Sequence, residues 1–550
     1  MLEHFDPNTI ADENLRQIFL YLLNLIESQA AQIKTLQEEN QALRDEINRL
    51  KGEQGRPKIK PNTPAVDLSS EKERHQPKPF HRGPKHHKIV IDREETCQVD
   101  RSTLPEDARF KGYHEVIVQD IVFQTNNVRF KREKYYSPGQ QKTYLAPLPG
   151  GFEGEFGPGV KAWVLELYFS GGMSEPKILE VLSQAGLVIS SGQISYFITE
   201  KQQEFHQESA AVCEAGLASS PWQHLDDTST RVDGVNHYCH IVCNPLYTVY
   251  RTLPHKDRLT VLQVLMGGKP LQYQLDEVAW LYLEEVGLAQ KWQVRLRALT
   301  QSGPISEAEL EQIFKQELQG LGEQQQRWIK EALGVAWYQN QTEYPVVQML
   351  LCDDAPQFHL VVEDLSLCWV HEHRHFKKLQ PVMAYHKELL EKFEKSFWDY
   401  YRELQAYQKV PDPIKAEELK LTFEKLFGHK TGYAALDQRL SLTLEKKTQL
   451  LMVLLHPEIP LHNNPAELGA RQRVRKRDVS FGPRSPAGTA AWDTFQSLAA
   501  TARKLGINFY RYLHDRICHT NLIEPLADII TARSKELNLG ASWVCSANAP

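Results

Sequence analysis

The sequence lacks long apolar runs: none of its segments approaches the roughly 18 consecutive apolar residues of a transmembrane helix. Its N-terminus carries acidic residues where a signal peptide would need a basic and then an apolar segment. We therefore expect a cytoplasmic protein without membrane contact. The eight cysteines also lack a repeated C-x-x-C spacing, which argues against a disulfide framework and a structural zinc ribbon.

An excess of positive charge is missing as well, because the formal net charge is -6 at pH 7. Any binding of nucleic acid must therefore rest on local basic patches. With 41% hydrophobic and 24% charged residues the composition is that of a globular protein. A chain of 550 residues exceeds what one hydrophobic core organises, so we expect a multidomain α/β protein.

The N-terminal segment 1–52 is dominated by an apolar repeat that averages 3.5 residues. This spacing predicts a coiled-coil dimerisation helix, and Asn40 at an a position favours a parallel pair. The alternative is one amphipathic helix packed on its own domain. The a and d positions are Phe19/Leu22, Ile26/Gln29, Ile33/Leu36, Asn40/Leu43 and Ile47/Leu50.

The composition changes three times before residue 216. Residues 53–88 are rich in Pro, Lys, Arg and His, which predicts a flexible basic linker that either touches DNA phosphates or is a solvated tether. Residues 89–150 contain β-branched runs such as YHEVIVQDIVFQTNNVRF and predict a small β module. Residues 158–215 show short helical blocks, which predict a helix-turn-helix with a recognition helix from Ser191, or a plain helical hairpin.

Three acidic motifs, LDDT, LLCDD and NNPAE, follow within 216–515 and are separated from one another by long helical insertions at about 268–344 and 372–455. The first two lie at predicted strands and the third opens a predicted helix. Neighbouring strands lie ~4.8 Å apart, so their carboxylates can share a cation such as Mg²⁺ or Mn²⁺ and support phosphodiester cleavage. Alternatively, the aspartates end strands or open turns, and Asn464 and Glu467 form a helix capping box.

A different chemistry is suggested by CWVHEHRHF, where His371, Glu372 and His375 match H-E-x-x-H. On a helix this pattern places two imidazoles on one face for zinc, with the carboxylate as general base of a metalloprotease. Such an enzyme needs a third ligand and a substrate cleft, neither of which the sequence identifies. Cys368 and His371 are either a structural pair or part of a metal site.

The motifs HLDDT, CDDAPQF, CWVHEHRHF and LHNNPAELGARQRVRKRDVSFG, with FGPGVKAWVLELYFSGGMSEPKILEVL upstream, resemble bacterial insertion-sequence transposases of the "sixty-six" group from about residue 89 to 515. The resemblance implies an RNase H-like catalytic domain with a DDE triad of Asp226, Asp353 and Glu467, which binds Mg²⁺ or Mn²⁺. It also selects the first aspartate of each Asp-Asp pair. The family is not built around zinc at the H-E-x-x-H position.

The resemblance implies a transposase that cuts DNA at the ends of an insertion sequence and joins them to target DNA. The basic run after the NNPAE motif would grip phosphates irrespective of base sequence, or form a solvated face; it contains Arg471, Arg473, Arg475, Lys476 and Arg477. Expected partners are double-stranded DNA, a second copy or a higher assembly, and small accessory proteins, at the nucleoid. Residues 516–550 are expected to be a C-terminal tail. The rival functions are a non-catalytic DNA-binding regulatory protein and the zinc protease.

Overall fold

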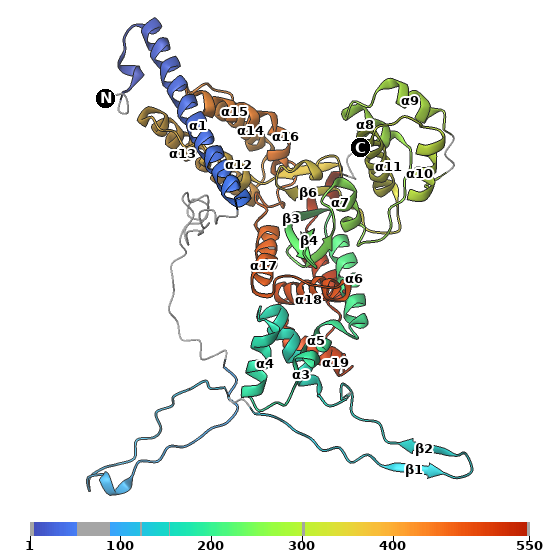
Figure 1. Cartoon of the computed structure of the whole chain (residues 1–550). Helices are drawn as coiled ribbons and strands as arrows, with labels where there is room; N and C mark the ends of the chain where they lie inside the picture. The colour runs from blue at the N-terminus through green and yellow to red at the C-terminus, as the bar shows by residue number, and fades with distance from the viewer. Residues whose placement is uncertain (1–4, 52–88, 122–123, 153, 300–302, 547–550) are drawn as a thin grey trace.

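The computed structural model describes residues 5–51, 89–121, 124–152, 154–299 and 303–546. A five-stranded sheet lies in the middle of the molecule, and a helical arm and a helical lobe project from it on opposite sides (Figure 1). The protein is therefore a multidomain, mixed α/β protein, as its sequence predicts. In the described part of the chain, no helix is long and apolar enough to cross a membrane. The predicted linker 53–88 lies outside the described residues.

Helix α1 (Glu13–Leu50), preceded by the short helix η2 (Pro7–Thr9), has two different halves. In the first half, the Asn24 side chain bonds the backbone of Gly432 and Ala434, each at 2.8 Å, and Glu27 accepts a hydrogen bond from Val382 N–H. This half packs on the helical arm of its own chain. The second half exposes the apolar positions Ile33, Leu36, Leu43, Ile47 and Leu50. The coiled coil therefore stays a prediction for the second half only.

Residues 89–121 and 124–152 form extended loops with one hairpin instead of the predicted β module (Figure 1). The hairpin pairs β1 (Lys134–Ser137) with β2 (Lys142–Leu145), and η4 (Arg101–Thr103) is a single turn. The strands predicted within YHEVIVQDIVFQTNNVRF are not formed by its described residues. Val118, for example, is 80% exposed, and a strand with no buried face lacks the packing that stabilises it.

The predicted helix-turn-helix region contains two short helices joined at Gly186, whose φ of +86° suits glycine. The second begins at Ser191, as predicted, and Ser190 caps it by accepting a hydrogen bond from Gln193 N–H at 3.2 Å. The helices are thus confirmed, whereas their contact with DNA stays a prediction. The helices of this region are α3 (Pro158–Leu165), the π-helical turn η5 (Glu166–Ser170), α4 (Glu175–Gln184), α5 (Ser191–Thr199) and α6 (Gln203–Ala218).

The central sheet has the strand order β5-β4-β3-β6-β7. Its first three strands form an antiparallel meander, and the last two run parallel to β3. Helix α7 follows the meander, and the first two acidic motifs lie at strands, as predicted. The bounds are β3 (Trp222–Val232), β4 (Val235–Cys243), β5 (Thr248–Leu253), α7 (Arg258–Leu265), β6 (Met349–Cys352), the turn η6 (Pro356–Phe358) and β7 (Asp364–Leu367).

Helix α18 (Pro486–Lys504) closes the outer edge of β5. Three backbone N–H groups of β5, two residues apart, donate to three side chains of α18 that are four residues apart. The bonds join Thr248 to Thr501 (3.2 Å), Tyr250 to Ser497 (2.9 Å) and Thr252 to Asp493 (2.6 Å). Because these edge amides already have acceptors, they do not offer a template to a further strand.

Both predicted insertions are helical. The first forms the lobe, where Arg258 of α7 makes a buried ion pair with Glu331 (2.7 Å); its helices are α8 (Glu277–Glu285), α9 (Gln290–Arg297), α10 (Glu307–Gln316) and α11 (Glu323–Asn340). The second forms the arm, with α12 (Trp369–Lys377), α13 (Ala384–Lys409), α14 (Pro413–Phe427), α15 (Ala434–Glu445), α16 (Lys447–Leu450) and the turn η7 (Met452–Leu454).

The predicted C-terminal tail, 516–550, is largely folded. Its helices α20 (Leu526–Leu537) and α21 (Ala541–Ser546) follow α17 (Asn464–Ser480), α18 and α19 (Phe509–Ile517). Leu526 and Ile530 are fully buried in the main core, and the Trp222 indole donates to the Leu539 carbonyl at 2.6 Å. The prediction of a tail was wrong because these apolar residues are too few to show a helical period alone.

Candidate active site

The two predicted aspartates lie just beyond the last parallel pair of β3 and β6, Asp226 within β3 and Asp353 directly after β6. Strands β3 and β6 pair so that His224 lies opposite Leu351, an offset of 127 positions. Continued for two residues, the same register places Asp353, which directly follows β6, opposite Asp226. Since neighbouring strands lie ~4.8 Å apart, the two carboxylates can reach one cation.

Helix α17 brings the third carboxylate to the same face of the sheet. Gly469 packs on Ile241, and a Cβ added to Gly469 would lie 2.8 Å from the Ile241 side chain. Ile241 is the β4 partner of Asp226 and therefore shares its face. Glycine permits this close approach of α17 to the sheet, and the Glu467 carboxylate lies near enough to Asp226 to contribute to the raised pKa of that aspartate.

The start of α17 is fixed by Asn463, which is fully buried. Its amide donates to the Leu225 carbonyl (2.8 Å), and its side-chain oxygen bonds His224 Nδ1 (2.9 Å). The helix therefore begins at Asn464 with Asn463 as the cap residue, and the Glu467 carboxylate turns towards α12 instead of back to the cap. The capping-box alternative is wrong. Sequence reasoning missed Asn463, although the Asn-Asn pair stands in the motif.

Two side chains of α12 face Glu467. Arg374 Nη2 lies 2.8 Å from its Oε2, and His371 Nε2 lies 3.6 Å from its Oε1. Arg374 belongs to the motif CWVHEHRHF, but the sequence alone predicted no role for it. In this state the glutamate is thus held by a guanidinium on one oxygen while the other faces an imidazole.

The site is rich in negative charge. Burial, followed by the nearby Asp353 carboxylate, raises the pKa of Asp226 to about 8. Burial also raises the pKa of Asp353, and the neighbouring His371 opposes that rise. Carboxylates that repel each other in this way fit a divalent cation with oxygen ligands, because the cation would remove the repulsion.

The second aspartate of each pair has other partners. Asp227 accepts a hydrogen bond from Gln357 (2.7 Å) and lies 3.9 Å from Lys256. Side chains alternate along a strand, so Asp227 points to the face opposite Asp226. Asp354 is paired with His359 (2.9 Å) and Lys446 (2.5 Å). Geometry therefore favours the first aspartate in both pairs, as the resemblance does.

The H-E-x-x-H residues lie on α12 but do not form a protease centre. Glu372 is buried and bound by Arg439, Thr443 and Lys446, so it is not free to act as a general base. The described side chains that do converge with metal-ligand spacing are Cys368, His371 and Glu467, whose ligand atoms all lie within 4.8 Å of one another. His371 thus joins Cys368 and Glu467, not His375, in the cluster.

The basic run is a helix, and only part of it is available to DNA. A stripe of α17 at helical spacing is buried: Ala466, Gly469, Arg473 and Lys476. Arg473 pairs with Asp493 (2.8 Å), and Lys476 donates to the Met173 carbonyl (3.0 Å). The prediction of phosphate binding was wrong for these two side chains. The 3.6-residue period would have revealed the stripe, because an i, i+3 pair shares one face.

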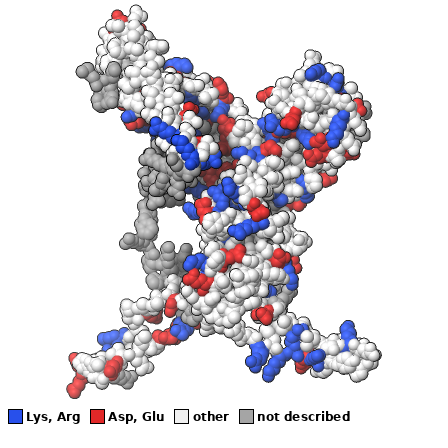
Figure 2. All heavy atoms as spheres, viewed as in Figure 1, with Lys and Arg blue, Asp and Glu red and all other residues white. Residues whose placement is uncertain are grey.

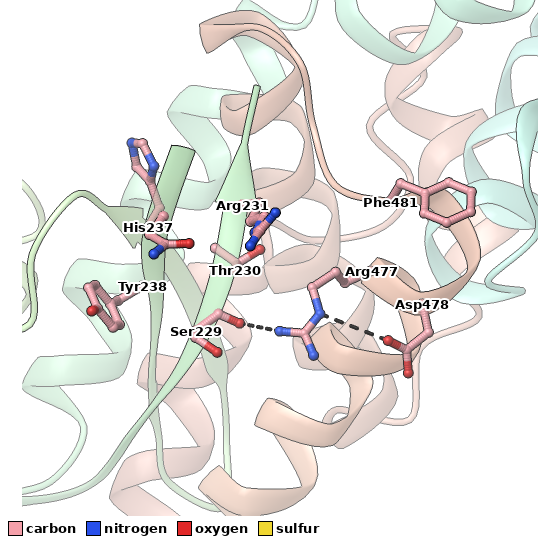
Figure 3. Close-up of a pocket in the computed structure, with 9 residues that line it drawn as sticks. Ser229, Thr230, Arg231, His237, Tyr238, Arg477, Asp478 and Phe481 are labelled. Atoms are coloured by element: carbon pink, nitrogen blue, oxygen red, sulfur yellow. Dashed lines mark hydrogen bonds and ion pairs between the residues drawn. The ribbon is translucent and has the colours of Figure 1, made fainter. Parts of the chain in front are cut away.

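The other basic residues of the run, Arg471, Arg475 and Arg477, retain access to solvent. Lys and Arg side chains gather over the middle of the molecule, where α17 lies (Figure 2). Arg477 lines a pocket of about 560 Å³ at the far end of β3 and donates to the Ser229 carbonyl (Figure 3). The remaining lining residues are Thr230, Arg231, Asn236, His237, Tyr238, Asp478 and Phe481.

Comparison with known proteins yields one informative relative. No family model and no solved structure matches the chain. An uncharacterized protein, y4jO of Sinorhizobium fredii (strain NBRC 101917 / NGR234), is 31% identical over 322 residues, which are 58% of this chain and 99% of the relative. With that identity over almost the whole relative, the chain belongs to the same protein family as y4jO.

Proposed function

We propose that the protein is a DNA transposase of the DDE type, with Asp226, Asp353 and Glu467 as ligands of Mg²⁺ or Mn²⁺. The observation that carries the proposal is the parallel register that sets Asp226 opposite Asp353, with Glu467 close enough to act on the Asp226 carboxylate. The strand order, a meander followed by two parallel strands and an acid-bearing helix, supports an RNase H-like catalytic domain.

The carboxylates act as metal ligands in this proposal, not as nucleophiles. Divalent cations bound there would activate the attacking oxygen and stabilise the leaving oxygen. Water first cleaves the phosphodiester at each element end and leaves a 3′-hydroxyl. That hydroxyl then attacks a phosphodiester of target DNA, so one bond forms as another breaks and no covalent protein intermediate is needed. Arg374 neutralises Glu467 before DNA and metal are bound.

The remaining surface suits double-stranded DNA. Arg471, Arg475 and Arg477 offer exposed or half-buried cations along one helix close to the carboxylates, which fits contact with phosphates. The exposed apolar positions in the second half of α1 suit a coiled coil with a second copy. Such a dimer would bring two element ends together in the bacterial cytoplasm, at the nucleoid, with or without accessory proteins.

The test is cleavage and joining of labelled DNA that carries the inverted repeats flanking the gene, in Mg²⁺ or Mn²⁺. Glu467→Gln should abolish nicking at the repeat ends while the protein still binds them. Asp227→Asn is the matched control, because Asp227 points to the opposite face, and it should retain nicking. Binding without cleavage by the wild type would favour the regulatory protein instead. Cleavage that survives Glu467→Gln would exclude the proposed triad.

A further inference from the structure

Cys368, His371 and Glu467 form a cluster of three different metal-ligating side chains beside the proposed catalytic aspartates. We propose that this cluster binds a thiophilic divalent cation of the zinc type, and that such a cation withdraws Glu467 from the proposed catalytic metal site. The binding site stands on its own geometry. Its inhibitory effect rests on the proposed function.

The fold places the three ligands next to one another by backbone register. Strands β6 and β7 pair in parallel with Cys352 opposite Leu367, so Cys368 follows β7 in the position where Asp353 follows β6. His371 lies three residues later, on the first turn of α12, and therefore on the same side as Cys368. Glu467 approaches from the first turn of α17.

Two side chains of the cluster each have a buried polar atom with unmet bonding capacity. Among the described residues, His371 Nδ1 and Glu467 Oε1 are buried without a hydrogen-bond partner. Buried polar atoms are rarely left so, and a bound ion is one of the few explanations. Arg374 occupies only Oε2 of Glu467, so Oε1 remains free to bind a cation.

The chemistry of the donors selects the cation. A thiolate, an imidazole and a carboxylate are the ligands of tetrahedral zinc sites, with water as a fourth ligand, whereas Mg²⁺ prefers oxygen alone. A cysteine thiol ordinarily carries its proton at neutral pH before a cation binds. Binding then forms a metal–sulfur bond and releases the thiol proton to solvent. The Asn463 N–H donates to Cys368 Sγ (3.1 Å) and stabilises the thiolate.

The direct test uses Co²⁺ as a spectroscopic probe of the full-length protein. One Co²⁺ per chain should produce thiolate charge-transfer absorption and the visible bands of tetrahedral cobalt; Zn²⁺ should displace it and excess Mg²⁺ should not. Cys368→Ser should abolish the charge-transfer band, whereas Cys97→Ser, which removes an exposed thiol, should leave it intact. A band that survives Cys368→Ser would overturn the proposal.

A second variant guards against misfolding of Cys368→Ser. His371→Gln keeps the thiol, and it should weaken Co²⁺ binding by about tenfold or more; unchanged affinity would contradict the site. For the inhibitory effect, nicking in Mg²⁺ is compared with and without Zn²⁺, each variant against its own zinc-free rate. Zinc should suppress the wild type but not Cys368→Ser. If no condition yields nicking, the proposed function fails while the cobalt spectrum still decides the site.

Discussion

Replacing Asp226 by Asn should make the metal-free protein more stable while destroying the proposed activity. Burial and Asp353 disfavour the ionised carboxylate and raise its pKa from 3.8 to about 8. At about 1.4 kcal/mol per pKa unit, the penalty for ionising Asp226 in the folded protein is at most ~6 kcal/mol. Asp226 keeps some contact with solvent, which screens the charge, so we expect Asp226→Asn to recover about 2–3 kcal/mol near neutral pH.

The stability difference between Asp226→Asn and the wild type should increase with pH. Below the unfolded pKa of 3.8 the carboxyl is protonated in both states and no penalty exists. As the pH rises towards about 8 the wild type loses stability progressively, and Asp226→Asn does not. The advantage of the variant should therefore grow through this window and then level off. Mg²⁺ or Mn²⁺ should stabilise the wild type and have less effect on the variant.

The assay is urea unfolding followed by circular dichroism in EDTA across that pH window, with Asp227→Asn as the control. Asp227 has Gln357 and Lys256 as partners, so its replacement should be neutral or slightly destabilising. If Asp226→Asn unfolds at lower urea than the wild type, or if its advantage does not change with pH, the crowded-carboxylate description is refuted.

Further predictions concern the helices around the site. Burial lowers the pKa of Lys476 to about 7, so Lys476→Met should raise the urea midpoint at neutral pH. The gain should shrink as the pH approaches 10.5, the pKa of the lysine in the unfolded chain. DNA affinity should be unchanged. Arg475→Ala should weaken binding to all duplexes alike and lower the salt slope by about one. Asn463→Ala leaves His224 Nδ1 and the Leu225 carbonyl buried without their hydrogen-bond partner, and it should lower the free energy of unfolding in urea by ~2–4 kcal/mol. Leu36→Lys with Leu43→Lys should convert a dimer into a monomer in sedimentation, and an unchanged mass would contradict the coiled coil.

Much of the region around the candidate site could be predicted from the sequence because its elements are local. Asp-Asp pairs lie in the middle of β3 and at the carboxyl end of β6, and the Asn-Pro pair marks the start of α17. The register between the strands could not be read from these motifs, since pairing between residues 127 positions apart depends on how both strands pack. The grouping of Asp226, Asp353 and Glu467 into one triad came from the family resemblance and not from these local patterns.

The errors have a shared physical cause, which is tertiary burial. The basic run was predicted to bind phosphates as a whole, so Arg473 and Lys476 were treated like Arg475. The structure instead buries Arg473 and Lys476 on the inner face of α17. Counting β-branched residues predicted strands near Val118, where no partner covers them. The cluster around Glu467 was also missed as a whole, because Cys368 and His371 meet the glutamate only through the parallel pairing of β6 with β7.

The row of hydrogen bonds between the β5 amides and the α18 side chains cannot be extended indefinitely, because helix and strand differ in their rise per residue. Four helical residues advance ~6.0 Å, whereas two strand residues advance ~6.6–6.8 Å, so each successive bond falls ~0.7 Å further out of step. Three bonds tolerate this drift, as their distances of 3.2, 2.9 and 2.6 Å indicate. A fourth would accumulate ~2 Å of mismatch, which would stretch such a bond to about 3.5 Å, the limit of hydrogen bonding. A straight helix can therefore bond in step with a short strand such as the six-residue β5, and its rise per residue limits the length of the strand that it can cover in this way.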